Sequence, residues 1–225
     1  MLKSIKTGVL AAILVSTAIF AHAQKKITEG TVTFGVEYSL TPEQEPMAAM
    51  LPAESKIKFN GNISKMEMQQ GPATITVLAN ISDLSSLVLI DVPVAQLQYA
   101  VKGTKADYEK EKANDPKFSD FKATGEKKTI LTYSAEKYTY KDDKGSTYEL
   151  WATNDIELPA GLIGRDFTGV KGTPIVFTTF NRGVKSTATL KSLVEEKTGP
   201  FSLDVPKGYD VKTMEEIMQM QGGGQ

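Results

Sequence analysis

The chain of 225 residues contains no cysteine and a single histidine, His22. The absence of cysteine excludes a disulfide framework, a thiolate nucleophile, an iron–sulfur cluster and cysteine-bound zinc. One histidine cannot build a 2-His-1-carboxylate iron site. Carboxylate, lysine, tyrosine and serine chemistry remain possible. Our expectation is nevertheless a non-enzymatic protein with no catalytic residue, no cofactor and no bound metal.

The histidine itself falls in residues 1–23, which have the layout of a secretory signal peptide. Lys3 and Lys6 precede a mostly apolar run, and Ala21-His22-Ala23 offers a small-x-small cleavage site. Cleavage there would leave 202 residues without histidine, which removes a Ser-His-Asp triad and an imidazole base. Because Gln24 follows instead of cysteine, we expect no lipid anchor. The predicted location is the periplasm, with full secretion as the alternative.

The charge of the chain disfavours a nucleic-acid partner, and its hydropathy disfavours a transmembrane span. The predicted mature chain has 24 basic and 27 acidic residues, and this mild acidity argues against nucleic acid. The longest later apolar run, Leu87 to Val101, is interrupted by Asp91 and Pro93, so it falls short of a transmembrane span.

Alternation of apolar and polar residues dominates the rest of the chain and predicts strands. A Lys-, Ala- and Glu-rich stretch at 104–114, ended by Asp115-Pro116, predicts one short surface helix. We expect a mainly β protein of about nine to eleven antiparallel strands in a single domain, 24–221, with a disordered glycine-rich tail at 222–225. The segments with the clearest alternation or apolar run are 32–40, 57–59, 63–68, 73–81, 87–92, 94–101 and 201–205.

Glycine-containing turns predict hairpins with defined registers. Asn60-Gly61 is a strong short hairpin signal. If Asp143-Lys144-Gly145 is a three-residue loop with Gly145 at positive φ, Tyr140 faces Tyr148. The same rule at Asn181-Arg182-Gly183 places Phe180 opposite Val184. Further along, these two registers pair Tyr138 with Leu150 and Val176 with Ala188.

Several strings occur together in one order along the second half of the chain. They are Glu126-Lys127-Lys128-Thr129-Ile130, Ala135-Glu136-Lys137-Tyr138-Thr139-Tyr140, Tyr148-Glu149-Leu150-Trp151-Ala152-Thr153-Asn154-Asp155-Ile156, Lys171-Gly172-Thr173-Pro174 and Phe201-Ser202-Leu203-Asp204-Val205-Pro206-Lys207-Gly208-Tyr209. The set resembles an uncharacterised family of Gram-negative envelope proteins, a domain of unknown function. That family in turn resembles the LolA/LppX-like lipoprotein-localisation fold.

The resemblance covers most of 28–220 and is most specific over 126–209. It implies an unclosed antiparallel β half-barrel with short helices over its concave face. In the best-known relatives this face shelters lipid or the acyl chains of lipoproteins. The carriers' functional residues have no counterparts here, so the resemblance implies a fold and not a site.

Apolar side chains on the predicted strands could line such a concavity, although each could equally belong to a filled core. The candidate lining consists of Val32, Phe34, Val36, Tyr38, Leu87, Leu89, Leu97, Tyr99, Tyr138 and Tyr148. Methionines are grouped, and Met214 and Met218 are candidates for a lid or an adaptable apolar surface. The alternatives for these methionines are helix packing at four-residue spacing and Cu(I) capture.

Three functions remain open. The first is a non-enzymatic periplasmic protein that binds a hydrophobic ligand, a lipid or a lipoprotein acyl chain. The second is an interaction module that docks on an envelope protein through a sheet edge or the Met-rich C-terminal segment. The third is a glycan hydrolase that would use Asp155, Glu157 or Asp166 near Trp151, the only tryptophan.

Overall fold

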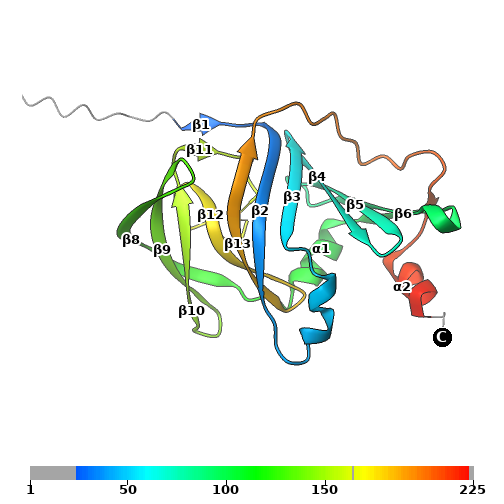
Figure 1. Cartoon of the computed structure of the whole chain (residues 1–225), viewed down its shortest axis with the longest axis horizontal. Helices are drawn as coiled ribbons and strands as arrows, with labels where there is room; N and C mark the ends of the chain where they lie inside the picture. Colours follow the sequence, from blue (N-terminus) through cyan, green and yellow to red (C-terminus); the bar gives the residue numbers. More distant parts are fainter. Residues whose placement is uncertain (1–23, 164, 223–225) are drawn as a thin grey trace, which may run out of the picture.

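The computed structural model describes residues 24–163 and 165–222. The predicted signal peptide at 1–23, the side chain of Met218 and residues 223–225 of the glycine tail lie outside this description. Within it the protein is mainly β, as predicted, with few short helices (Figure 1). The strands are β1 Lys25–Lys26, β2 Glu29–Ser39, β3 Glu54–Asn60, β4 Ile63–Gln70, β5 Ala73–Asn80, β6 Ser86–Val92, β7 Leu97–Gly103, β8 Phe118–Ile130, β9 Tyr133–Asp142, β10 Thr147–Thr153, β11 Ile156–Glu157, β12 Thr173–Asn181, β13 Val184–Val194 and β14 Asp210–Val211.

Twelve of these strands form one unclosed sheet in the order β14-β7-β6-β5-β4-β3-β2-β13-β12-β10-β9-β8. All its pairings are antiparallel except that of β14 with β7, and β1 and β11 form a separate parallel pair. β7 and β8 follow one another in the chain but lie near opposite ends of the strand order. Figure 1 shows β8–β10 on one side, β4–β6 on the other, and β2 and β13 between them. The described residues form fourteen strands, more than the nine to eleven expected. The difference comes from β1, β11 and β14, because strands of two residues leave no periodic pattern in the sequence.

The helices are short, and only α2 contributes a buried side chain among the described residues, Ile217. They are the 3₁₀ segments η1 Glu45–Met50 and η2 Pro93–Ala95, and the α-helices α1 Lys105–Lys112 and α2 Met214–Gly222. The surface helix predicted at 104–114 is confirmed as α1, which starts with a capping box between Thr104 and Asp107. Neither η1 nor α1 buries a residue. They therefore do not provide the apolar cover that the resemblance implied.

The structure confirms the predicted register of one glycine-containing hairpin and corrects that of the other. In the β9–β10 hairpin, Tyr140 pairs with Tyr148 and Gly145 has φ +83°, as predicted. In the β12–β13 hairpin, Asn181 pairs with Val184 and Phe180 with Lys185, so the predicted register is wrong by one residue. The loop there has only two residues, Arg182 and Gly183, both at positive φ. A two-residue turn of this kind matches the twist of the flanking strands, which explains why Asn181 joins its strand.

Replacing Gly183 with alanine is expected to lower the free energy of unfolding by about 1 kcal/mol. The cause would be backbone strain alone, because the added Cβ meets no atom within 4 Å. Gly183→Asn serves as the control, since asparagine tolerates positive φ, and its loss should be smaller. Urea unfolding measures both variants. Equal stability of wild type and Gly183→Ala would contradict the two-residue turn.

The strand predicted at 201–205 is wrong, because this segment forms no ladder with the sheet. Its alternation has another cause: Phe201, Leu203 and Val205 pack, together with Tyr209, on the buried side chains Leu78, Leu87, Leu89 and Ala100. In Figure 1 the chain leaves β13 and runs back across the top of the molecule toward β6 and α2. We call residues 195–211 the strap.

Candidate functional site

Directly paired residues of neighbouring strands share a face of the sheet, so the register divides the predicted lining residues between two faces. We call the face that carries Phe34 the inner face. Phe34 of β2 contacts Phe177 of β12, which contacts Phe167 in the chain between β11 and β12, so side chains from separate parts of the chain meet there. The opposite face, which carries Leu87, is the outer face. Eight predicted lining residues lie on the inner face: Val32, Phe34, Val36, Tyr38, Leu97, Tyr99, Tyr138 and Tyr148.

Leu87 and Leu89 lie on the outer face, away from the other eight. Leu87 is 1% exposed and packs, with Leu89, under the strap. The strap is anchored by Glu29, whose Oε1 accepts hydrogen bonds from the backbone N–H groups of Thr198 and Gly199. These two bonds lower the pKa of Glu29. The two leucines are therefore core residues beneath a chain segment of the protein itself.

Over β8, β9, β10, β12, β13 and β2 the inner face is filled by the segment 158–172. Leu158 and Phe167 from this segment are buried against the sheet, and Leu162 packs beside them. An Arg165 side-chain nitrogen donates to the carbonyl oxygen of Ile81, which ties the segment to the chain after β5. Val32, Phe34 and Tyr138 lie beneath this filling and are at most 5% exposed. These three residues are core and do not line an open space.

Aromatic rings make up most of the filled part. Phe167 stacks on Phe118 with ring centroids 5.7 Å apart and meets Tyr140 edge-on at 5.6 Å. Tyr140 is fully buried, and this burial raises its pKa to about 12, so its hydroxyl stays neutral. Tyr148 stacks on Tyr140 at 5.5 Å. Tyr148 is thus a member of an aromatic core.

Over β4–β7 the inner face differs, because its apolar side chains belong to none of the three buried clusters. The register aligns them in two rows across the strands. One row is Met66, Val77, Val88 and Val101, and the other is Met68, Ile75, Ile90 and Tyr99. We call these eight residues the apolar strip. It crosses four strands, or roughly 14 Å of sheet.

The apolar strip is partly open. Of its eight side chains only Val101 is buried, at 5% exposure, and the other seven have intermediate exposure. No inner-face position of the described strands β4–β7 carries a charge, whereas their outer face carries Lys65, Glu67, Asp91 and Lys102. Beside the strip runs a row of small residues, Ser64, Ala79, Ser86 and Gly103. An uncharged, partly exposed face of this kind can take up an apolar group without leaving a charge unpaired.

Sequence reasoning found only Tyr99 of the apolar strip as a lining residue, with Leu97 at its end. It missed Val88 and Ile90 because they lie in the continuous apolar run 87–90, where either set of alternate residues could face inward. Met66 and Met68 are two of the grouped methionines of the sequence, but the grouping does not show which way they face. Ser55 Oγ lies 3.5 Å from the Met66 sulfur, as a weak donor. The pairing of β4–β7 is the signal that identifies the strip.

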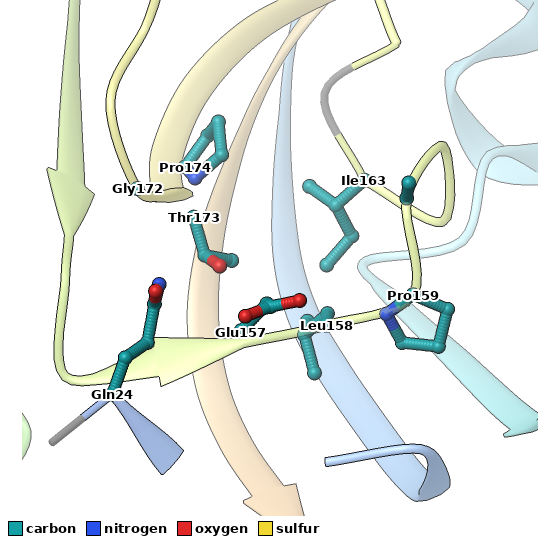
Figure 2. Close-up of a pocket in the computed structure, with 9 residues that line it drawn as sticks. Gln24, Glu157, Leu158, Pro159, Ile163, Gly172, Thr173 and Pro174 are labelled. Atoms are coloured by element: carbon teal, nitrogen blue, oxygen red, sulfur yellow. The ribbon is translucent and has the colours of Figure 1, made fainter. Parts of the chain in front are cut away.

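Two small cavities lie away from the apolar strip. The first, about 230 Å³, lies between β11 and the segment 158–172, with Gln24 and Thr173 on one side and Pro159 and Ile163 on the other (Figure 2). Gln24 and Thr173 both donate to the carbonyl oxygen of Ile156, so their polar atoms serve the fold. The second, about 290 Å³, is lined by Thr28, Glu29, Glu195, Glu196 and Lys197. Both are smaller than typical ligand pockets of about 300–1,000 Å³.

The remaining candidates are separate from these features. Asp155 accepts from the Ser134 N–H at 2.6 Å, Glu157 pairs with Lys26 at 3.5 Å, and Asp166 lies 3.9 Å from Lys112. Each carboxylate thus has a partner outside the trio. Met214 begins α2 and is 38% exposed. Among the described residues, no group of three or more His, Cys, Asp or Glu side chains could hold a metal ion.

Comparison with known proteins places the chain without assigning an activity. None of the helices in the described part of the chain is long and apolar enough to cross a membrane. A search of curated proteins gives no match. Residues 45–163, more than half of the chain, match the family described as "Domain of unknown function (DUF4412)". The match runs from η1 through β11 and includes the whole apolar strip, and the chain belongs to this family.

Proposed function

We propose that the protein is a non-enzymatic binding protein of the bacterial periplasm that holds a lipid, or the acyl chain of a lipoprotein, on the apolar strip. The observation that carries this proposal is the uncharged, partly exposed inner face of β4–β7, next to a part of the same face that is filled. The LolA/LppX-like resemblance of the sequence supports the same ligand class. The periplasmic location rests on the sequence pattern of residues 1–23.

The chemistry of the strip favours a hydrocarbon chain over a polar ligand. Its side chains are aliphatic or thioether groups, with one tyrosine ring, so they offer a ligand almost no hydrogen bond. A chain gains roughly 0.8 kcal/mol for each methylene that leaves water, so contact along two rows would suffice for stable binding. Met66 and Met68 are flexible and fit chains of different shape.

Paired substitutions in one row test the proposal. Ile75→Ser with Ile90→Ser removes two directly paired aliphatic side chains and adds no charge. We expect the dissociation constant for a fluorescent polyene fatty acid to rise at least about tenfold, because roughly 1–2 kcal/mol of apolar contact is lost at each position. Leu131→Ser is the control, since Leu131 is 53% exposed in the β8–β9 turn. A folded double variant with wild-type affinity would refute the strip as the binding site.

Native purification from the envelope fraction, followed by organic extraction and mass spectrometry, identifies the ligand. A stoichiometric lipid or acylated peptide would support the proposal. A ligand-free protein that also takes up no fatty acid would overturn it.

A second candidate is the interaction module, favoured by exposed apolar residues at the end of the strap and in α2. Val211 is 61% exposed, and Met214 and Met220 in α2 are 38% and 50% exposed. Such a surface fits a protein partner in the envelope. Photo-crosslinking from position 219 in whole cells tests this candidate: a discrete protein adduct from a chain that binds no fatty acid would favour it.

A further inference from the structure

One end of the apolar strip is formed by two neighbouring turns. The β4–β5 turn is closed by the pair Gln70–Ala73, and the β6–β7 turn by the pair Val92–Leu97. Thr74 pairs with Asp91, so the two turns lie side by side at the same end of the sheet. We call residues 69–73 and 92–98 the tip.

The tip exposes apolar side chains and carries no charge. Val94 in η2 is 81% exposed and Leu97 is 41% exposed. The remaining residues of the tip are Gln, Pro, Gly, Ala and Val. Asp91, just behind the tip, is already bonded to Tyr209 and Gln98. Val94 and Leu97 would gain free energy by leaving water for another apolar phase, and no charge on the tip opposes this.

The tip is continuous with the apolar strip. The Val92–Leu97 pair lies next to the Ile90–Tyr99 pair in the same ladder, and all four side chains are on the inner face. An apolar path therefore runs from the exposed turn onto the strip, without a charged inner-face residue on the described strands. Such a path would let a hydrocarbon chain pass from a lipid surface to the strip without crossing water.

A lysine stands beside this apolar end. The strap turns at Pro206–Tyr209, where Tyr209 N–H donates to the Pro206 carbonyl oxygen. A Cβ on Gly208 would lie 3.3 Å from Gln98 Oε1, so this turn, with the exposed Lys207, lies against the tip. Apolar residues that enter a bilayer next to a basic residue that meets phosphate groups are typical of lipid-surface contacts.

We infer that the tip is a docking surface for a lipid bilayer, with Val94 and Leu97 entering the interface and Lys207 facing the phosphate headgroups. A protein partner fits less well, because protein interfaces combine an apolar centre with aromatic residues, arginine and a polar rim. The inference deepens the proposed function, since the membrane would be the source or destination of the bound chain. Vesicle binding can nevertheless be measured separately from ligand binding.

Flotation of the protein as purified from the envelope with lipid vesicles tests the inference. Wild type should float with phosphatidylcholine vesicles, and about fivefold more tightly when phosphatidylglycerol is added, the effect expected for one lysine at an anionic surface. Val94→Glu should weaken binding to both vesicle types at least about tenfold. Lys207→Ala should remove only the preference for anionic vesicles. Leu131→Glu is the control, because it places the same charge on an exposed leucine in the β8–β9 turn.

The outcomes separate this inference from the proposed function. Wild type that stays with the soluble fraction, or Val94→Glu that floats like wild type, would overturn the tip as a bilayer contact. Either result leaves fatty-acid binding on the strip unaffected. A protein that floats as expected, but whose Ile75→Ser/Ile90→Ser variant binds fatty acid normally, would retain the tip and refute the strip. Val94 is so exposed that its substitution should not affect folding, which circular dichroism verifies.

Discussion

Phe167→Ala is expected to lower the free energy of unfolding by about 3–5 kcal/mol, the cost of removing a large ring from a packed core. Phe167 is 5% exposed, and its ring lies within 6.2 Å of the rings of Phe118, Phe121, Tyr140 and Phe177. It is also the main anchor of the segment 158–172 on this part of the sheet. Urea or guanidinium unfolding, followed by tyrosine and tryptophan fluorescence, measures the loss.

Tyr140→Phe is the matched control for this core. The Tyr140 hydroxyl lies 3.5 Å from the Thr178 carbonyl oxygen, a long and weak hydrogen bond. Removal of the hydroxyl keeps the aromatic ring in place, so we expect the free energy of unfolding to fall by less than about 1 kcal/mol. If Phe167→Ala were no more destabilising than Tyr140→Phe, the segment 158–172 would not be part of the folded core.

Deletion of residues 200–225 is expected to lower the free energy of unfolding by about 4–6 kcal/mol. It removes four half-buried side chains, Phe201, Leu203, Val205 and Tyr209, each of which contributes roughly half of full burial. It also uncovers Leu87 and Leu89 on the outer face. We therefore expect the truncated protein to bind an environment-sensitive hydrophobic dye and to associate in solution.

Deletion of 213–225 is the matched control, because it keeps the strap and β14 and removes only α2 and the tail. The loss should stay below about 2 kcal/mol, since Ile217 is the one buried side chain in the described part of α2. If α2 covers the apolar strip, this shorter truncation should raise fatty-acid affinity. Equal destabilisation by both truncations would contradict the strap as cover for the outer face.

The local sequence pattern was sufficient to predict a strand where one of its faces is buried and the other is exposed to solvent. The strand from Val32, the helix after Thr104 and the Tyr140–Tyr148 register all follow from periodicity, capping and turn chemistry. The β12–β13 register did not, since Asn181-Arg182-Gly183 permits a two-residue or a three-residue loop. The twist of the two strands selects the shorter one.

The candidate site could be predicted only in part. For β6 the apolar run 87–90 offers two alternate sets, and sequence reasoning chose Leu87 and Leu89. These lie under the strap, while Val88 and Ile90 lie on the apolar strip. A single strand that is apolar on both faces contains no information about which face meets a ligand. The strand predicted at 201–205 was wrong for a related reason. A segment that packs on a sheet shows the same alternation of apolar and polar residues as a strand within the sheet.

The sequence by itself determined a mainly β protein without cysteine chemistry, the β9–β10 hairpin and the surface helix α1, because these depend on neighbours a few residues apart. The tertiary structure decided which apolar residues are core and which are accessible. That decision depends on contacts between distant parts of the chain. The segment 158–172 fills the inner face of one half of the sheet, and the strap covers the outer face of the other. What neither segment covers is the apolar strip.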